Sequence, residues 1–285
     1  MKANGTGVKQ LTKDAHKDSD PKWSPDGKEI MCLKDFKIVF IDMAGNITRT
    51  LTTQKIPTSA IWATSGKQIY YTAYTSADES ATSAKVENIY QYDLLNNRES
   101  QITDFLMPAK GYRPIYDLAA SPDGKTLAIV TTPFVFEEDP NDGPFAVNIY
   151  TINTSGTDLK LLVKKARDPA WSPNGALLAY TAGGQQPERD VHEKIFVYDF
   201  ETQKSSQLTN GIWEDRYPVF SPDGTKIAFS SGRHRFRVNG RELFVINIDG
   251  TGEARITPIQ INPDGKFKNH FLYGWATDTE PDWTS

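Results

Sequence analysis

Several features that would identify a class of protein are scarce or absent in this chain. Its single cysteine, Cys32, excludes an intrachain disulfide. Its four histidines, His16, His192, His234 and His270, show no metal-ligand spacing such as H-x₃-H. No apolar run approaches the ~18–20 residues of a membrane-spanning helix, no signal peptide is visible, and no convincing amphipathic helix is found. The sequence therefore gives no sign of a disulfide scaffold, a compact metal motif or a membrane span.

Motifs for common catalytic chemistry are also missing. The sequence has no G-x-S-x-G nucleophile elbow and no α/β-hydrolase pattern, so a serine hydrolase would need a catalytic domain outside this chain. It has no G-x-x-x-x-G-K-[ST] phosphate-binding loop. The formal net charge is −4 and the isoelectric point about 5.7, which argues against a nucleic-acid partner. The sequence therefore predicts no nucleic-acid binding and names no reaction.

What the chain does contain is one short phrase that recurs five times. The copies are WSPDG at 23–27, a degraded WATSG at 62–66, SPDG at 121–124, WSPNG at 171–175 and FSPDG at 220–224. The steps between their final glycines are 39, 58, 51 and 49 residues. A repeat of ~40–50 residues with about four short strands is the sequence signature of a β-propeller. The sequence therefore predicts an all-β fold, a β-propeller of four-stranded blades.

The fifth repeat shows the pattern of one blade most clearly. An apolar strand at 218–220 leads through the turn at 221–224 to an alternating strand at 226–230. An apolar strand at 243–246 and a more polar outer strand at 254–257 complete it, with an Asp-Gly turn between them. The same order of elements predicts blades at approximately 18–53, 59–104, 115–164, 167–210 and 216–257, within a single domain spanning 1–285.

The two ends of the chain match parts of one further blade. Residues 1–12 align without a gap on 246–257, and residues 281–285 align on 218–222. A closing blade built from 1–12 and 279–285 would lack the counterpart of residues 223–245, which is 23 residues. We therefore predict six blades with an incomplete closing blade, in a chain that has lost the start of a longer protein. A five-bladed ring is the alternative. The open strand edge would permit self-association.

The repeated segments resemble a known family. PKWSPDGKEI, PAWSPNGALLAY and PVFSPDGTKIAFSS are similar to the WD40-like (PD40) repeat of the TolB family, and the similarity extends over almost the whole chain. The resemblance implies a propeller that binds a protein partner or ligand at the mouth of its channel. It also implies a periplasmic or secreted location, with a cytoplasmic one left open. Related propellers occur as gating domains of prolyl-oligopeptidase-like enzymes and in oligogalacturonate lyases.

Acidic residues precede nearly every inner strand of the predicted blades, at the end where a propeller channel opens. These acids either cap local turns or form a ring of carboxylates that binds a cation or a basic peptide. Trp213, Tyr217 and Tyr116 break the repeat pattern, which makes them candidates for contact with a partner. We predict a binding surface composed of Asp20, Tyr116, Asp168, Trp213, Asp215, Arg216, Tyr217 and Glu280. We expect no catalytic residues and no cofactor.

A carbohydrate-active propeller of the oligogalacturonate-lyase type, or a lectin-like sugar binder, is the alternative. Its candidate sugar or metal site comprises His192, His234, Arg235 and His270. Basic residues cluster between Arg233 and Arg241, where they form either a solvated hairpin tip or a site for an acidic sugar. The prediction is thus a non-catalytic binding propeller, with this enzyme class left open.

Overall fold

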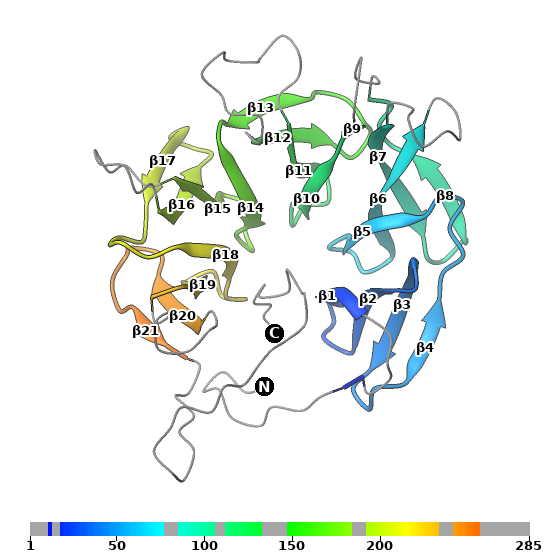
Figure 1. Cartoon of the computed structure of the whole chain (residues 1–285), viewed down its shortest axis with the longest axis horizontal. Helices are drawn as coiled ribbons and strands as arrows, with labels where there is room; N and C mark the ends of the chain where they lie inside the picture. The colour runs from blue at the N-terminus through cyan, green and yellow to red at the C-terminus, as the bar shows by residue number, and fades with distance from the viewer. Residues whose placement is uncertain are drawn as a thin grey trace. The chain divides into compact units, whose positions relative to one another are not determined.

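The computed structural model of the chain describes residues 11–12, 18–76, 85–105, 112–132, 147–183, 192–233 and 242–256. Within these ranges the regular elements are β-strands, which form five sheets of consecutive strands (Figure 1). Each sheet is a four-stranded antiparallel blade in a propeller arrangement, and one blade carries an additional short strand. The predicted all-β propeller is therefore confirmed. No helix in the described ranges is long and apolar enough to cross a membrane.

The chain divides into two compact units. The N-terminal unit holds the described residues between 11 and 169, and the C-terminal unit holds those between 170 and 256. The first blade of the N-terminal unit contains β1 (Asp18–Trp23), β2 (Glu29–Lys34), β3 (Lys37–Asp42) and β4 (Ile47–Thr50). The second contains β5 (Pro57–Trp62), β6 (Gln68–Ser76), β7 (Lys85–Asp93) and β8 (Arg98–Gln101), and β9 (Tyr112–Arg113) pairs in parallel with β7. The third contains β10 (Ile115–Ala120), β11 (Thr126–Thr131), β12 (Asn148–Asn153) and β13 (Lys160–Val163).

The remaining two blades supply the C-terminal unit. The fourth blade contains β14 (Ala166–Trp171), in which the boundary between the units falls, β15 (Leu177–Gly183), β16 (Glu193–Asp199) and β17 (Lys204–Gln207). The fifth contains β18 (Asp215–Phe220), β19 (Lys226–Ser231), β20 (Glu242–Asn247) and β21 (Ala254–Arg255). Five blades are thus described. The predicted closing blade from 1–12 and 279–285 lies outside the described residues except for positions 11 and 12, so a sixth blade and a single domain stay predictions.

The repeated Ser-Pro-Asp-Gly phrase forms a tight turn between the first two strands of a blade. In the third blade the Gly124 amide donates to the Ser121 carbonyl over 2.9 Å, and Gly124 has a φ of +69°, a conformation that glycine adopts without strain. The Ser121 hydroxyl donates to Asp123 Oδ1 over 2.6 Å and accepts from the Thr126 amide over 3.0 Å. The hydrogen bond from Ser121 lowers the pKa of Asp123. The serine, the acidic residue and the glycine of the phrase therefore each have a structural reason to recur.

Within each unit, neighbouring blades pack through apolar side chains. In the N-terminal unit Phe40 of β3 meets Trp62 of β5 edge to face, with ring centroids 5.3 Å apart. In the C-terminal unit Ile195 of β16 and Phe229 of β19 belong to one buried cluster. Burying a side chain of this size contributes roughly 1.5–3 kcal/mol relative to leaving it exposed. The strands therefore provide a rigid support for the loops that join them.

The inner strands carry an irregularity near their starts. The pairing register shifts between Ser19 and Lys22 in the first blade and between Arg216 and Val219 in the fifth. Asp20 lies within the first of these bulges, with a φ of +54°. Its carboxylate accepts from the Ser59 hydroxyl over 2.6 Å and from the Ala60 amide over 3.0 Å, both on β5 of the next blade. The bulge thus turns this side chain toward the neighbouring blade, to which it is tied.

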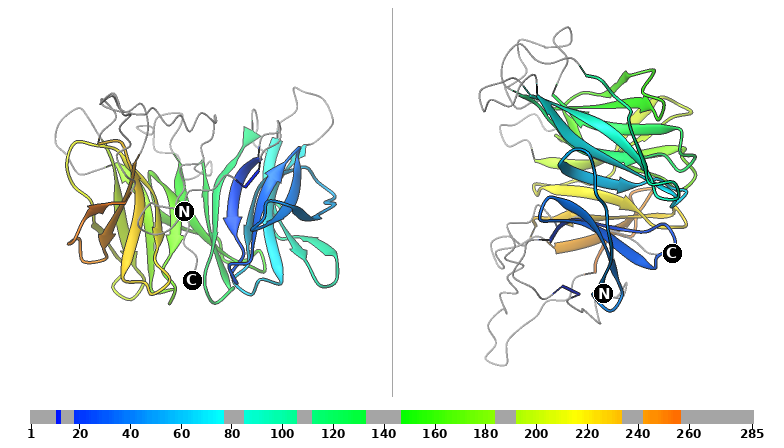
Figure 2. Two further views of the ribbon diagram at one scale, coloured as in Figure 1. Left: turned by 90° about the horizontal axis from the view of Figure 1, so that it is seen from below. Right: turned by 90° about the vertical axis from the view of Figure 1, so that its right-hand side faces the viewer.

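The register of the strands brings particular segments to one end of each blade. In the fifth blade Asp215, at the start of β18, pairs with Ser231, at the end of β19. Ser231 in turn pairs with Glu242, at the start of β20. The start of the inner strand and the start of the third strand therefore lie at the same end, which we call the entry end of the blade. Figure 2 shows these strands from the side.

Candidate functional site

The loop between β17 and β18 combines an exposed apolar side chain with contacts to a buried ion pair. We call residues 208–214 the Trp213 loop. Its first part is fixed to β16, because the Ile195 amide donates to Thr209 Oγ1 over 3.0 Å and the Leu208 amide donates to the Ile195 carbonyl over 2.8 Å. Further along, the Ile212 side chain is 65% exposed, more than any other large hydrophobic side chain described in this unit. Trp213 follows it and is partly buried.

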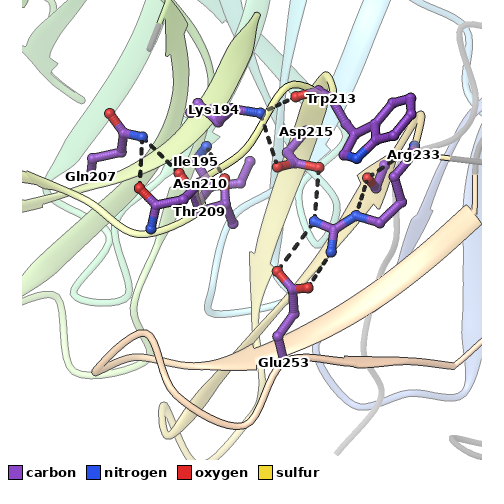
Figure 3. A network of polar contacts seen from close by, with 10 residues as sticks. Lys194, Ile195, Gln207, Thr209, Asn210, Trp213, Asp215, Arg233 and Glu253 are labelled. Atoms are coloured by element: carbon purple, nitrogen blue, oxygen red, sulfur yellow. Dashed lines mark hydrogen bonds and ion pairs between the residues drawn. The ribbon is translucent and has the colours of Figure 1, made fainter. Parts of the chain in front are cut away.

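Beneath the Trp213 loop lies a buried ionic network, drawn in Figure 3. Asp215 is fully buried, and its carboxylate lies between two cations. Lys194 Nζ is 3.5 Å from Asp215 Oδ2, and Arg233 Nη2 is 3.4 Å from Asp215 Oδ1. Lys194 also donates to the Trp213 carbonyl. Burial lowers the pKa of Lys194, although the nearby Asp215 carboxylate opposes the shift. Three segments of the chain are therefore joined by charge, and the Lys194 and Asp215 side chains at the centre are almost inaccessible to solvent.

Arg233 extends the network toward solvent. Its guanidinium donates to both carboxylate oxygens of Glu253, with Nη2 3.2 Å from Oε2. Its Nε donates to Ser231 Oγ over 2.9 Å, and its Cζ lies 4.3 Å from the centroid of the Phe244 ring. A guanidinium that makes a bidentate hydrogen bond and lies over an aromatic ring is restricted to few conformations. Arg233 therefore fixes the second side of Asp215.

A second ionic group lies beside the first. Arg216 Nε pairs with the Glu193 carboxylate, and Arg216 Nη2 is 3.8 Å from Glu214 Oε1. The three side chains are 24%, 18% and 35% exposed, in the order Arg216, Glu193 and Glu214. Taken together, the two groups contain three cations and four carboxylates. The charges nearly balance, and each cation is paired with a carboxylate of the same group. Such an arrangement suits a rigid platform for binding better than it suits proton transfer.

No metal centre is found in the part of the chain that the structure describes, since no three His, Cys, Asp or Glu side chains come together there. Of the alternative sugar or metal site, His192 lies just before β16 and is partly buried. His234, Arg235 and His270 lie outside the described residues. That alternative therefore stays a prediction.

The structure brings together three of the predicted binding residues in the C-terminal unit, and three others belong to the N-terminal unit. Trp213, Asp215 and Arg216 all belong to the ionic platform and its loop. Tyr217 follows directly, with a φ of +55°, an uncommon backbone conformation for a bulky residue. Asp20, Asp168 and Tyr116 lie in the N-terminal unit, where Asp20 joins two blades and Tyr116 is 53% exposed. Glu280 lies outside the described residues.

Sequence reasoning missed Lys194, Glu193 and Glu253 as parts of the platform. Lys194 stands at the start of a third strand, where the second and third blades have Asn88 and Asn148. The first blade also has a lysine there, Lys37, so the residue type alone did not mark Lys194. Glu253 lies in the turn before β21, and no sequence pattern connects it to Arg233, twenty residues earlier.

Comparisons with known proteins agree with the fold. No family model matches the chain. Dipeptidyl-peptidase 5 of Porphyromonas gingivalis is 29% identical over 118 residues, which is 40% of this chain and 16% of that protein. The chain spans less than half the length of each curated relative it matches, between 13% and 43%.

Two solved structures illustrate the similarity in fold. A candidate TolB from Agrobacterium tumefaciens superimposes with a TM-score of 0.64 at 18% identity, covering 86% of this chain and 82% of that one. An oligogalacturonate lyase in complex with manganese gives a TM-score of 0.61 at 17% identity, covering 89% of this chain and 68% of that one. At these identities the likeness concerns the fold alone.

Proposed function

We propose that this chain is a non-catalytic, TolB-like propeller that binds a protein partner, with the Trp213 loop as the central contact. The observation that carries the proposal is the exposed Ile212 and the adjoining Trp213 on a loop held from below by the buried Lys194–Asp215 pair. A buried ion pair seldom adds net stability, so we assign this pair to holding the loop and not to stabilising the fold. Tryptophan is among the residues enriched in interaction hot spots, and here it lies beside an exposed apolar side chain on a fixed loop.

The comparisons support this proposal without extending it to an activity. The fold resemblance to TolB structures is compatible with a binding propeller. Dipeptidyl-peptidase 5, of which the chain covers a small part, contains far more sequence than a propeller of this length. We therefore assign binding to this chain and no catalytic step. The periplasmic or secreted location belongs to the same proposal.

A peptide-display experiment tests the proposal. A library of random, unstructured peptides is panned against the immobilised chain, and a selected peptide is then measured by calorimetry. We expect Trp213→Ala and Ile212→Ser to weaken its binding by at least about tenfold, the loss typical of truncating a hot-spot side chain. The matched control is Ile248→Ser, because Ile248 is 41% exposed in the turn after β20, at the other end of a blade of the same unit. We expect the control to bind like the parent.

The result that would contradict the proposal is equally specific. Selected peptides whose affinity is unchanged by Trp213→Ala and Ile212→Ser, but is lost with Ile248→Ser, would move the binding surface to the opposite end of the blade. Failure to select any binding peptide, together with binding of an oligogalacturonate or Mn²⁺, would favour the carbohydrate-active alternative.

A further inference from the structure

We infer that Lys194 is the positioning residue of this site: its side chain holds the Trp213 loop in the conformation that presents Ile212 and Trp213. The inference rests on the proposed function for its biological use, but the position of the loop can be measured without any ligand. It assigns a role to a residue that the sequence pattern alone had not marked.

The first argument comes from the same position in two other blades. At the start of the third strand, Asn88 and Asn148 are both fully buried. Asn88 Oδ1 accepts from the Phe105 amide over 2.8 Å, and Asn148 Oδ1 accepts from the Lys165 amide over 2.9 Å. Phe105 and Lys165 both lie in the segment that leads from an outer strand toward the next inner strand. In both blades, the side chain at this position therefore fixes the loop that leads into the next inner strand.

Lys194 contacts the equivalent peptide group through its carbonyl oxygen, whereas the asparagine in the third blade contacts the N–H. Counting back from the inner strands, Lys165 precedes β14 directly, as Glu214 precedes β18. Asn148 accepts from the N–H of the peptide between residues 164 and 165. Lys194 instead donates to the carbonyl of the peptide between Trp213 and Glu214. The peptide thus presents its carbonyl to the third strand instead of its N–H, so the Trp213 loop approaches β18 differently from the loop that enters β14.

The second argument concerns the cost of placing an ammonium at this position. The Lys194 side chain is 1% exposed, and the charged groups around it are Asp215, Arg233 and Glu214. Removing one member of such a buried pair leaves the other charge without full compensation. Without Lys194, the Trp213 carbonyl would lose this hydrogen bond, and among the described cations Asp215 would keep Arg233. Both changes act on the Trp213 loop and its junction with β18.

Hydrogen exchange and Trp213 fluorescence test the inference directly. Lys194→Met removes the charge and the donor while keeping an unbranched side chain, and Lys194→Arg keeps both. We expect the amides of residues 212–216 to exchange at least about tenfold faster in Lys194→Met, as a locally opened loop requires. The emission assigned to Trp213, by difference from Trp213→Phe, should shift in the same variant. Lys194→Arg should remain close to the parent in both measurements.

The matched control is Asn148→Ala in the third blade. It removes a pin of the same kind, so exchange should rise around residues 164–166 while the Trp213 signals stay unchanged. Unchanged exchange and emission in Lys194→Met would overturn the inference. If Lys194→Met fails to fold, the ¹⁵N resonance of the Lys194 ammonium in the parent chain decides. Slowly exchanging ammonium protons support the buried contact, and rapidly exchanging ones overturn it.

The selected peptide separates this inference from the proposed function. A Trp213 loop that moves in Lys194→Met, with loss of peptide binding, supports both. A loop that moves while peptide binding persists supports the positioning role and contradicts the proposed function. A loop that does not move overturns the positioning role, whatever the peptide does.

Discussion

At the scale of single residues, buried carboxyl groups act as ties between strands and blades of the N-terminal unit. Glu87, on β7, is 2% exposed. Its Oε1 is 2.5 Å from the Thr58 hydroxyl on β5, and its Oε2 accepts from the Ile115 amide at the start of β10, in the next blade. Burial raises the pKa of Glu87, although both hydrogen bonds act against the shift. The group therefore joins two blades but resists ionisation.

This raised pKa predicts a pH dependence of stability. Folding favours the protonated form of Glu87, so its contribution is fully present below the unfolded-state pKa of about 4.3 and is lost as pH rises through the higher folded-state pKa. Glu87→Gln should remove that part of the pH dependence, since an amide keeps a donor and an acceptor without a charge. Glu87→Ala, which removes both hydrogen bonds, should cost about 1–3 kcal/mol.

Urea unfolding measured across the acid-to-neutral range checks this prediction. The control is Glu201→Gln, because Glu201 is exposed in the turn after β16. A Glu87→Gln chain with the same pH slope as the parent would refute the assigned role of Glu87.

Residue identity predicted part of the candidate site. Trp213 could be selected from the sequence because it departs from the repeat, and Asp215 because acidic residues precede nearly every inner strand; Arg216 was predicted beside them. Lys194 and Glu253 could not be connected to them, since ion pairs between strands depend on register and on the path of each loop. Asp20 was selected as a binding residue, and its contacts with Ser59 and Ala60 arise from a bulge that no sequence pattern announced.

At the scale of elements, the turns between strands differ in how tightly they are enclosed. Gly156, in the turn after β12, has a φ of +82°, and a Cβ placed on it would lie 2.0 Å from the Ile102 carbonyl oxygen after β8. Gly124, in the turn after β10, has a similar φ of +69° but nothing within 4 Å of such a Cβ. The same substitution therefore meets backbone strain alone at one site, and strain with a steric clash at the other.

This pair of glycines gives a matched test of packing between the second and third blades. Gly124→Ala should cost about 1 kcal/mol, the strain of a left-handed residue. Gly156→Ala should cost about 2–4 kcal/mol, because the Ile102 backbone must also move. Thermal and urea unfolding of the two variants provide the measurement. Equal losses would contradict the close approach of the β12–β13 turn to the second blade.

The repeated turn phrase was the element most readily predicted from sequence. Its serine, acidic or amide residue and glycine are each used in the turn, as in Ser121, Asp123 and Gly124. The left-handed conformations of Asp168 and Tyr217 within inner strands were not predictable from the sequence. Proline follows both residues, and a residue before proline normally adopts an extended backbone. These irregularities depend on how one inner strand meets its neighbours.

At the scale of the whole molecule, the proposed function predicts the response to small ligands. A ligand that binds the folded state alone raises its unfolding temperature. For a protein-binding propeller we expect EDTA, Mn²⁺, Ca²⁺ and neutral or uronate oligosaccharides to leave the unfolding temperature of the full chain unchanged. A rise with Mn²⁺ or with uronates would instead support the alternative site at His192, His234, Arg235 and His270.

The fold class could be predicted for the whole molecule because the repeat is visible as spacing and phrase. The number of blades could not be fixed in the same way, since the predicted closing blade uses 1–12 and 279–285 and follows from alignment of the chain ends. Five blades are described, and the sixth stays a prediction.

The most direct measurement of the central claim is a hydrogen-exchange footprint of the full chain with and without a selected peptide. The proposed function predicts protection concentrated in the Trp213 loop and the first residues of β18, within 209–217. It predicts little change in the turn after β20, around Ile248, in the same unit. Protection around Ile248, with the Trp213 loop exchanging as in the free chain, would contradict the account.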